Sequence, residues 1–202
     1  PRQLVMFGTN GGWIYGLPAK AADGVPPQEP AWAHKLGGSF VADPTFTMVG
    51  AGDDRSALVV FPGRDGWVYG CDPATGRRNW WLLSESPFSE RAVVSADHVF
   101  VRNDDRLFCL NAITGERAWW PSSAEGKSDY EKSQLFESPE GFELADRCLA
   151  ANSERAILLS GRNRLMRCNM ATGAIETETS LPAFDFFLTN AATGALILGT
   201  HD

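Results

Sequence analysis

The residues whose types could do chemistry gather in one stretch, GCDPATGRRNWW at residues 70–81. It combines an acid, Asp72, with two guanidinium groups, Arg77 and Arg78, and two adjacent tryptophans. Aromatic rings can bury an apolar ligand while a few charged groups orient it, so this composition suits a small-molecule site. Taken alone, the stretch is a candidate ligand site.

The stretch recurs twice, and the recurrence changes its interpretation. CLNAITGERAWW follows at residues 109–120 and RCNMATGAIETE at 167–178, where the tryptophans are lost. An Asx side chain accepts a hydrogen bond from a backbone amide two residues on, and Gly adopts a conformation that strains other residues. We therefore interpret the shared positions as a structural turn. These positions are Asp72, Thr75, Gly76, Asn111, Thr114, Gly115, Asn169, Thr172 and Gly173.

Other reactive residue types do not form a constellation. The three histidines share no position in the repeat, and acidic pairs such as Asp53-Asp54 are typical of turn tips. No CxxC pair, Ser-His-Asp order or phosphate-binding loop occurs. The cysteines are interpreted as small buried hydrophobes, with a disulfide left open: Cys71, Cys109, Cys148 and Cys168. We predict no catalytic, cofactor-binding or metal-binding residue, and no cofactor.

Each turn belongs to a longer unit that reads as four strands. Short apolar runs such as LVMF at 4–7 and LVVF at 58–61 precede a position that holds only Gly, Asp or Asn, residues that tolerate the positive φ of a tight hairpin. A further strand precedes each hairpin, at 46–51, 91–96, 147–152 and 185–190. Four antiparallel strands in about 40 residues are typical of a β-propeller blade. The predicted fold class is therefore all-β, a β-propeller.

The repeats predict one propeller domain over residues 1–202 with about four blades. The expected blades are residues 4–45, 46–90, 91–146 and 147–184, with a partial fifth at 185–202. We expect an open arc, a partial propeller or part of a larger one; the alternative is a closed four-bladed ring completed by residues 185–190. Because unpaired strand edges seek partners, we expect association with another copy or another chain.

The repeated turn resembles the tryptophan-docking repeat of the PQQ-like, quinoprotein-type β-propellers, A-x-[DN]-x-x-T-G-x-x-x-W. GCDPATGRRNW and CLNAITGERAW match this motif except at the opening Ala. In that family the Trp packs against the small first residue and the Gly peptide of a neighbouring motif. The resemblance therefore implies that Trp80 and Trp119 fasten blade to blade. It also explains the fourth copy, in which a bulky Arg167 replaces the small residue and Thr177 replaces the ring.

The resemblance implies two functions. Some PQQ-like propellers are dehydrogenases that hold PQQ on the propeller axis, in many cases beside a vicinal Cys-Cys pair and a calcium ion. This sequence has no Cys-Cys pair and no recognisable acidic calcium cluster. Other members, such as an outer-membrane assembly lipoprotein, are scaffolds that hold polypeptide. We expect a noncatalytic protein-binding or scaffold module, and not an enzyme; the alternative is a fragment of a PQQ-dependent quinoprotein dehydrogenase.

The longest departure from the repeat is the insertion at residues 121–146. Long loops in compact domains are usually functional or disordered. We predict that this insertion contacts a partner, through Tyr130, Leu135, Phe136 and Phe142.

Charge and hydropathy limit the classes of partner that the chain can bind. The net charge of −7 and the pI of about 5.0 disfavour nucleic acid, whose phosphates need a basic face. No apolar run reaches the roughly 18 residues of a membrane span, and no signal peptide stands in this chain. The resemblance implies an extracytoplasmic location, either periplasmic or secreted.

Overall fold

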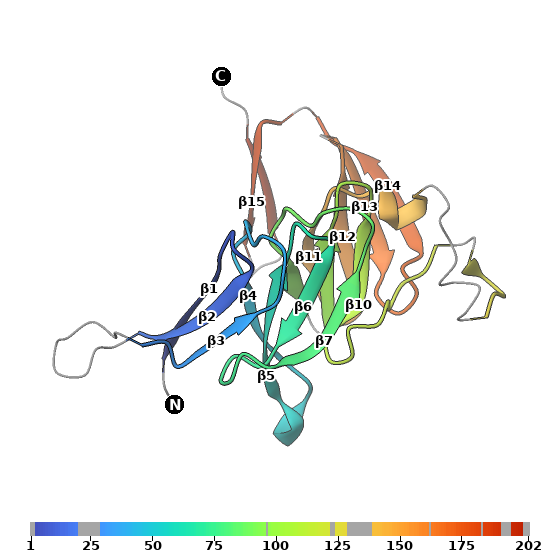
Figure 1. Cartoon of the computed structure of the whole chain (residues 1–202). Helices are drawn as coiled ribbons and strands as arrows, with labels where there is room; N and C mark the ends of the chain where they lie inside the picture. The colour runs from blue at the N-terminus through green and yellow to red at the C-terminus, as the bar shows by residue number, and fades with distance from the viewer. Residues whose placement is uncertain are drawn as a thin grey trace. The chain divides into compact units, whose positions relative to one another are not determined.

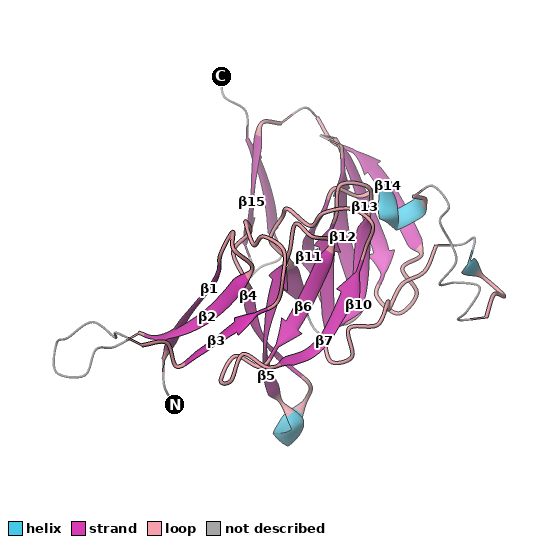
Figure 2. Ribbon diagram, viewed as in Figure 1, coloured by secondary structure: helices cyan, strands magenta, loops and turns pink. Residues whose placement is uncertain are grey.

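The structure, a computed structural model, describes residues 3–19, 29–95, 97–121, 124–128, 139–161, 163–182, 184–190 and 195–199. These residues form antiparallel β-sheets of two to four strands, together with the 3₁₀ turns Gly52–Asp54 and Gly141–Leu144 (Figure 2). The predicted all-β class is confirmed. The chain folds as two compact units, residues 1–104 with 110–116, and residues 105–109 with 117–202.

The first unit contains a three-stranded sheet in the order β1-β2-β3 and a four-stranded sheet in the order β4-β5-β6-β7 (Figure 1). The strands of the first sheet are β1 (Leu4–Gly8), β2 (Trp13–Pro18) and β3 (Trp32–Lys35). Those of the second are β4 (Thr45–Val49), β5 (Ser56–Pro62), β6 (Trp67–Cys71) and β7 (Arg78–Leu83). A third sheet, in the order β10-β9-β8, is formed by β8 (Val93–Ser95), β9 (His98–Arg102) and β10 (Leu107–Asn111).

The second unit contains a four-stranded sheet in the order β11-β12-β13-β14 and a two-stranded sheet. The four strands are β11 (Arg147–Ala151), β12 (Arg155–Ser160), β13 (Arg164–Asn169) and β14 (Ile175–Ser180). The two-stranded sheet pairs β15 (Phe186–Asn190) with β16 (Ala195–Gly199). The first strands of the last two repeats, β11 and β15, therefore lie where the sequence predicts them, at 147–152 and 185–190.

The first two hairpins form because glycine occupies their tightest positions. Gly12 has φ 77 and Gly66 has φ 85, a region that residues with a Cβ rarely adopt. At Gly66 an added Cβ would also collide with the carbonyl oxygen of Ser84. These two hairpins therefore depend on a residue without a side chain.

Adjacent sheets of the first unit share a core. One face of the first sheet, which carries Ile14 and Trp32, packs with Val59, Phe61 and Tyr69 of the second sheet. All five side chains are at most 8% exposed. Burying this apolar surface is the main stabilising contribution to the stacking of one sheet on the next.

Strand register places equivalent residues of different repeats in the same place. Gly16 lies opposite Trp32, Gly70 lies opposite Trp80, and Arg167 lies opposite Thr177. A bulge follows the glycine in the second sheet and Arg167 in the fourth. The pairing of a small residue with a ring, and of Arg with Thr, is therefore a direct cross-strand relation.

Candidate functional site

The acid of the opening stretch is used within its own turn. The Asp72 carboxylate accepts hydrogen bonds from the Thr75 amide at 2.8 Å and from the Thr75 hydroxyl at 3.0 Å. The Thr75 hydroxyl oxygen in turn accepts one from the Arg77 amide at 3.3 Å. The other copies repeat the pattern: Asn111 accepts from the amides of Ile113 and Thr114, and Asn169 accepts from the amide of Ala171. These oxygens stabilise the turn.

The glycine that closes each turn is required for two reasons. Gly76, Gly115 and Gly173 have φ 70, 76 and 75, and each donates its amide to the carbonyl of the Asx residue that opens the turn. A Cβ at Gly115 would lie 2.6 Å from the Trp80 ring, and one at Gly173 would lie 2.8 Å from the Trp119 ring. The glycine therefore supplies both the backbone conformation and the space for an indole.

Each of these tryptophans lies between two repeats. The Trp80 ring lies where a Cβ of Gly70, on its own sheet, and a Cβ of Gly115, in the next turn, would stand. Its indole Nε1 donates to the carbonyl of Ala112 at 2.8 Å. Trp119 makes the equivalent bond to Met170 at 2.7 Å. Both rings are buried, at 4% and 1% exposure, so each stabilises the junction by apolar burial and by one satisfied donor.

A third tryptophan that the sequence analysis did not assign has the same geometry. Trp32 lies against Gly16 on one side and Gly76 on the other, and its Nε1 donates to the carbonyl of Pro73 at 3.0 Å. The motif does not identify Trp32 because PAKAADGVPPQEP replaces the usual turn in the first repeat. The small Gly16 before the insertion and the tryptophan directly after it were the signal in the sequence that could have identified it.

In the fourth repeat, ion pairs are found in the region where the earlier repeats have the tryptophan ring. Arg167 pairs with Glu176 at 3.2 Å, and Arg164 pairs with Glu178 at 2.6 Å. From Glu176 onward the residues of β14 are exposed. The fourth sheet thus presents a polar outer strand where the earlier repeats place an indole.

The four cysteines are free and buried. Burial raises the pKa of the Cys71, Cys148 and Cys168 thiols to about 12, and it raises the pKa of Cys109 as well. A thiol with a raised pKa is a poor nucleophile and a poor metal ligand, because both roles need the thiolate. Among the described residues, no group of three or more His, Cys, Asp or Glu is placed to hold a metal ion.

A family model described as "Outer membrane protein assembly factor BamB" matches residues 64–176, more than half of the chain. The chain belongs to this PQQ-like β-propeller family. The match contains the second and third turns with Trp80 and Trp119, and it extends through the fourth turn.

Solved structures agree on the fold. The chain is similar to BamB from Moraxella catarrhalis, with 16% identity and a TM-score of 0.57 over 91% of this chain and 50% of that one. It is also similar to the Cps50 (Swd1) β-propeller domain of Myceliophteria thermophila, with 10% identity and a TM-score of 0.59 over 98% and 58%.

A third similar structure is BBS1N in complex with ARL6DN, with 15% identity and a TM-score of 0.54 over 93% and 54%. The chain therefore spans little more than half the length of these structures. No curated protein matches the chain.

In this PQQ-like propeller, the predicted partner-contact residues fall in two groups. Tyr130, Leu135 and Phe136 lie outside the described residues. Phe142 is described, and at 3% exposure its ring stands edge-on to Trp119 with centroids 5.2 Å apart. Phe142 therefore faces the interior of the second unit, contrary to what an exposed partner anchor requires.

The end of the insertion is held by a buried ion cluster. The Glu143 carboxylate, which is fully buried, accepts from Arg117 at 2.6 Å and from Arg106 at 3.5 Å. Burial lowers the pKa of Arg117, while the neighbouring Glu143 raises it. The Arg117 guanidinium also lies over the Phe108 and Trp120 rings, at 4.9 and 4.5 Å. The cluster ties the 3₁₀ turn Gly141–Leu144 to strand β10 and to the residues that follow the third turn.

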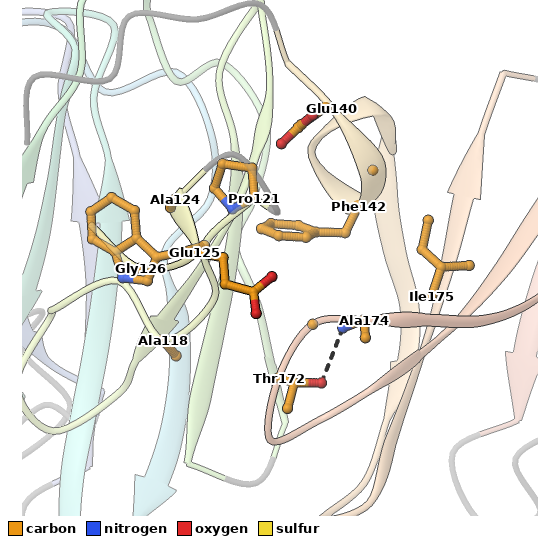
Figure 3. Close-up of a pocket in the computed structure, with 13 residues that line it drawn as sticks. Ala118, Pro121, Ala124, Glu125, Gly126, Glu140, Phe142, Thr172, Ala174 and Ile175 are labelled. Atoms are coloured by element: carbon orange, nitrogen blue, oxygen red, sulfur yellow. Dashed lines mark hydrogen bonds between the residues drawn. The ribbon is translucent and has the colours of Figure 1, made fainter. Parts of the chain in front are cut away.

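Beside this cluster lies a surface hollow of about 770 Å³ (Figure 3). Figure 3 shows Pro121 and Phe142 on one side of it and Thr172 and Ala174 of the fourth turn on the other. Its lining is more apolar than polar and includes two acids, Glu125 and Glu140. A second, smaller hollow of about 470 Å³ in the first unit is basic, lined by Lys35, Arg77 and Arg78.

The described residues also include no helix of the length and apolarity needed to cross a membrane.

Proposed function

We propose that this PQQ-like propeller is a noncatalytic protein-binding or scaffold module. The observation that carries the proposal is the set of large apolar side chains exposed on the first unit. Phe46 and Met48 of β4 are 54% and 41% exposed, Val5 is 55% exposed, and Trp13 is 39% exposed. Large apolar side chains exposed in this way are typical of sites that bind protein.

The chemistry-bearing residues support the same proposal because they are already engaged. The Asx oxygens close turns, the indole Nε1 groups of Trp32, Trp80 and Trp119 donate to backbone carbonyls, and the thiols are protonated and buried. Such residues position sheets and do not react. None of these groups is a general acid, a general base or a nucleophile that lies in a cleft.

The comparisons add support at the level of the family. The matching family is described as an outer membrane assembly factor, and the BBS1N structure contains a second protein, ARL6DN. Since identity to the solved structures is 16% or less, no particular partner is carried over. An extracytoplasmic location, periplasmic or secreted, belongs to the same proposal and rests on the family.

The quinoprotein alternative is less well supported by the residues present. A PQQ and calcium site needs oxygen ligands gathered around the cation, and the described residues place no such group together. Their indoles at the repeat junctions are buried between glycines. Thermal unfolding with PQQ and calcium should therefore show no stabilisation, and an artificial electron-accepting dye should not be reduced in the presence of an alcohol.

Binding is tested by site-specific photo-crosslinking. A benzophenone side chain replaces Phe46, Trp13 or, as a polar control on the same unit, Asp53, and the purified protein is irradiated with extract from the compartment in which it resides. We expect a discrete protein adduct from an apolar position and none from position 53. Dye reduction that depends on PQQ, without any adduct, would establish the enzymatic alternative.

A further inference from the structure

The basic hollow of the first unit is not explained by the structural contacts of the turns. It has a volume of about 470 Å³ and is lined by residues of β3, of the second turn and of β7. β3 and β7 are the last strands in the orders β1-β2-β3 and β4-β5-β6-β7 (Figure 1). A concave site of this size can hold a small molecule.

Strand register shows which side chains border the hollow from the two sheets. His34 is opposite Ile14, and Trp81 is opposite Tyr69. Ile14 and Tyr69 both belong to the core that the first and second sheets share. Because opposite residues lie on the same face of a sheet, His34 and Trp81 lie on the two faces that form this core. The Trp81 ring is 54% exposed, so the hollow lies where the core opens to solvent.

Arg78 is held in place over the Trp81 ring. The carbon of its guanidinium lies 5.1 Å from the ring centre, which is a cation–π contact. Its charge also acts on the core beside the hollow. Burial and then the Asp65 charge raise the pKa of Tyr69 to about 12, whereas the Arg78 charge lowers it. The Arg78 cation therefore lies on the same side of the second sheet as the hollow.

The guanidinium groups of Arg77 and Arg78 are not engaged by a carboxylate. Within the described part of the chain, neither forms an ion pair, whereas arginines such as Arg164 pair with a glutamate. Asp72, the acid of the same turn, accepts from Thr75 instead. A guanidinium presents its N–H donors as a planar fork that matches the oxygens of a carboxylate or a phosphate. Two such forks line one hollow.

Lys35 also lines the hollow, but its charge is used on the other face of the first sheet. Lys35 is opposite Trp13 and follows His34, so its side chain points away from the second sheet. Its ammonium donates to the carbonyl of Gly11 and lies over the Trp13 ring, 5.8 Å from the ring centre. The cations that a ligand in the hollow would meet are therefore the two arginines.

We propose that this hollow binds a phosphate group, which Arg77 and Arg78 hold. A phosphate monoester carries a charge of about −1.5 to −2 at pH 7, which two guanidinium groups balance. A carboxylate carries one charge and leaves the second guanidinium unbalanced. The volume beside Trp81 and His34 receives the rest of a phosphorylated molecule. This ligand site is additional to the proposed protein-binding role and does not depend on it.

Phenyl phosphate is the probe that tests the site. It is titrated into the full chain at low ionic strength, where exposed charges are screened least, and isothermal titration calorimetry follows binding. Saturable binding is expected. Arg77→Gln and Arg78→Gln should each weaken it at least about tenfold, because each removes charge-assisted hydrogen bonds. Both side chains are exposed, so the variants keep their fold, which circular dichroism checks.

The matched control is Lys35→Gln, which removes the same charge from a residue of the same hollow whose ammonium points away. This variant should bind phenyl phosphate as the natural chain does. Arg78→Lys keeps the charge but loses the planar fork. It should bind more weakly than the natural chain and more tightly than Arg78→Gln.

Two further probes identify what is recognised. Phenyl sulfate has a similar shape but a single negative charge, and it should bind more weakly than phenyl phosphate. Inorganic phosphate that binds as tightly as phenyl phosphate would support the site with the free ion as its ligand. Tighter binding of phenyl phosphate would support it with a phosphorylated molecule as the ligand.

Three results would overturn the proposal. Phenyl phosphate could fail to bind; Lys35→Gln could weaken binding as much as Arg78→Gln, which would show only a response to total charge; or phenyl sulfate and benzoate could bind as tightly as phenyl phosphate, which would assign the hollow to any anion. Photo-crosslinking from Phe46 or Trp13 tests different residues, so each of these results leaves the proposed protein-binding role untouched.

Discussion

At the scale of single residues, the structure shows that the cluster at residues 70–81, whose composition resembles a ligand site, makes structural contacts within its turn and with the next repeat. Trp80 occupies the space that the missing side chains of Gly70 and Gly115 leave free, and Asp72 is engaged by its own turn. The same residue types would suit chemistry if they faced a cleft. Their partners, more than their identities, determine what they do.

The glycine contact gives a stability prediction with an internal control. Gly115→Ala should destabilise the chain by about 2–4 kcal/mol, from about 1–2 kcal/mol of positive-φ strain plus the collision with Trp80. Gly126→Ala should cost only the strain, since Gly126 has φ 74 but no atom within 4 Å of its absent Cβ. Urea unfolding measures both.

A double variant separates the two causes. In a Trp80→Leu background, the effect of Gly115→Ala should fall to that of Gly126→Ala, because the ring is gone and the strain remains. Equal costs of Gly115→Ala with and without the indole would show that the ring contributes nothing at this junction.

The buried thiols predict loss of stability in alkali. Their pKa values in the folded chain are raised from about 9 to about 12 for Cys71, Cys148 and Cys168, so the folded state keeps them protonated. Stability is therefore fully present below pH 9 and falls as the pH rises from 9 toward 12, by up to about 1.4 kcal/mol per pH unit for each thiol.

Urea unfolding at pH 8, 9 and 10 measures this dependence, and Cys71→Ala should reduce its slope by the share of one thiol. A free energy of unfolding that stays constant from pH 8 to pH 10 would contradict the burial of these groups.

At the scale of elements, the 3₁₀ turn Gly141–Leu144 is held by charge inside the second unit. Glu143→Ala should destabilise the chain by about 3 kcal/mol, because it leaves the partly buried Arg117 guanidinium without its carboxylate. The matched control is Glu176→Ala, which removes a carboxylate from an exposed pair and should have a small effect. Thermal unfolding compares the two, and similar shifts in Tm would rule out the cluster as an anchor.

The elements also show what the sequence could and could not predict. The repeat alignment predicted the strands, the turns and the coupled change of Arg167 and Thr177, because each depends on residue types at fixed spacing. It gave Trp32 no docking role, because an insertion replaces its turn, and it gave no sign that Phe142 is buried. Both facts concern contacts between distant segments, which spacing along the chain does not encode.

At the scale of the whole molecule, the chain is a propeller segment that spans little more than half the length of the similar structures described above. The exposed apolar residues on the first unit are the surface that it offers to another polypeptide. These features support the proposed role of the propeller as a protein-binding or scaffold module.

The most direct test is native mass spectrometry of the protein that carries this sequence, isolated without denaturation from the cells that make it. The account predicts a complex whose mass exceeds that of the polypeptide by the mass of a second, distinct protein, and which dissociates into the two. A polypeptide recovered alone, carrying PQQ and reducing an electron-accepting dye, would contradict it.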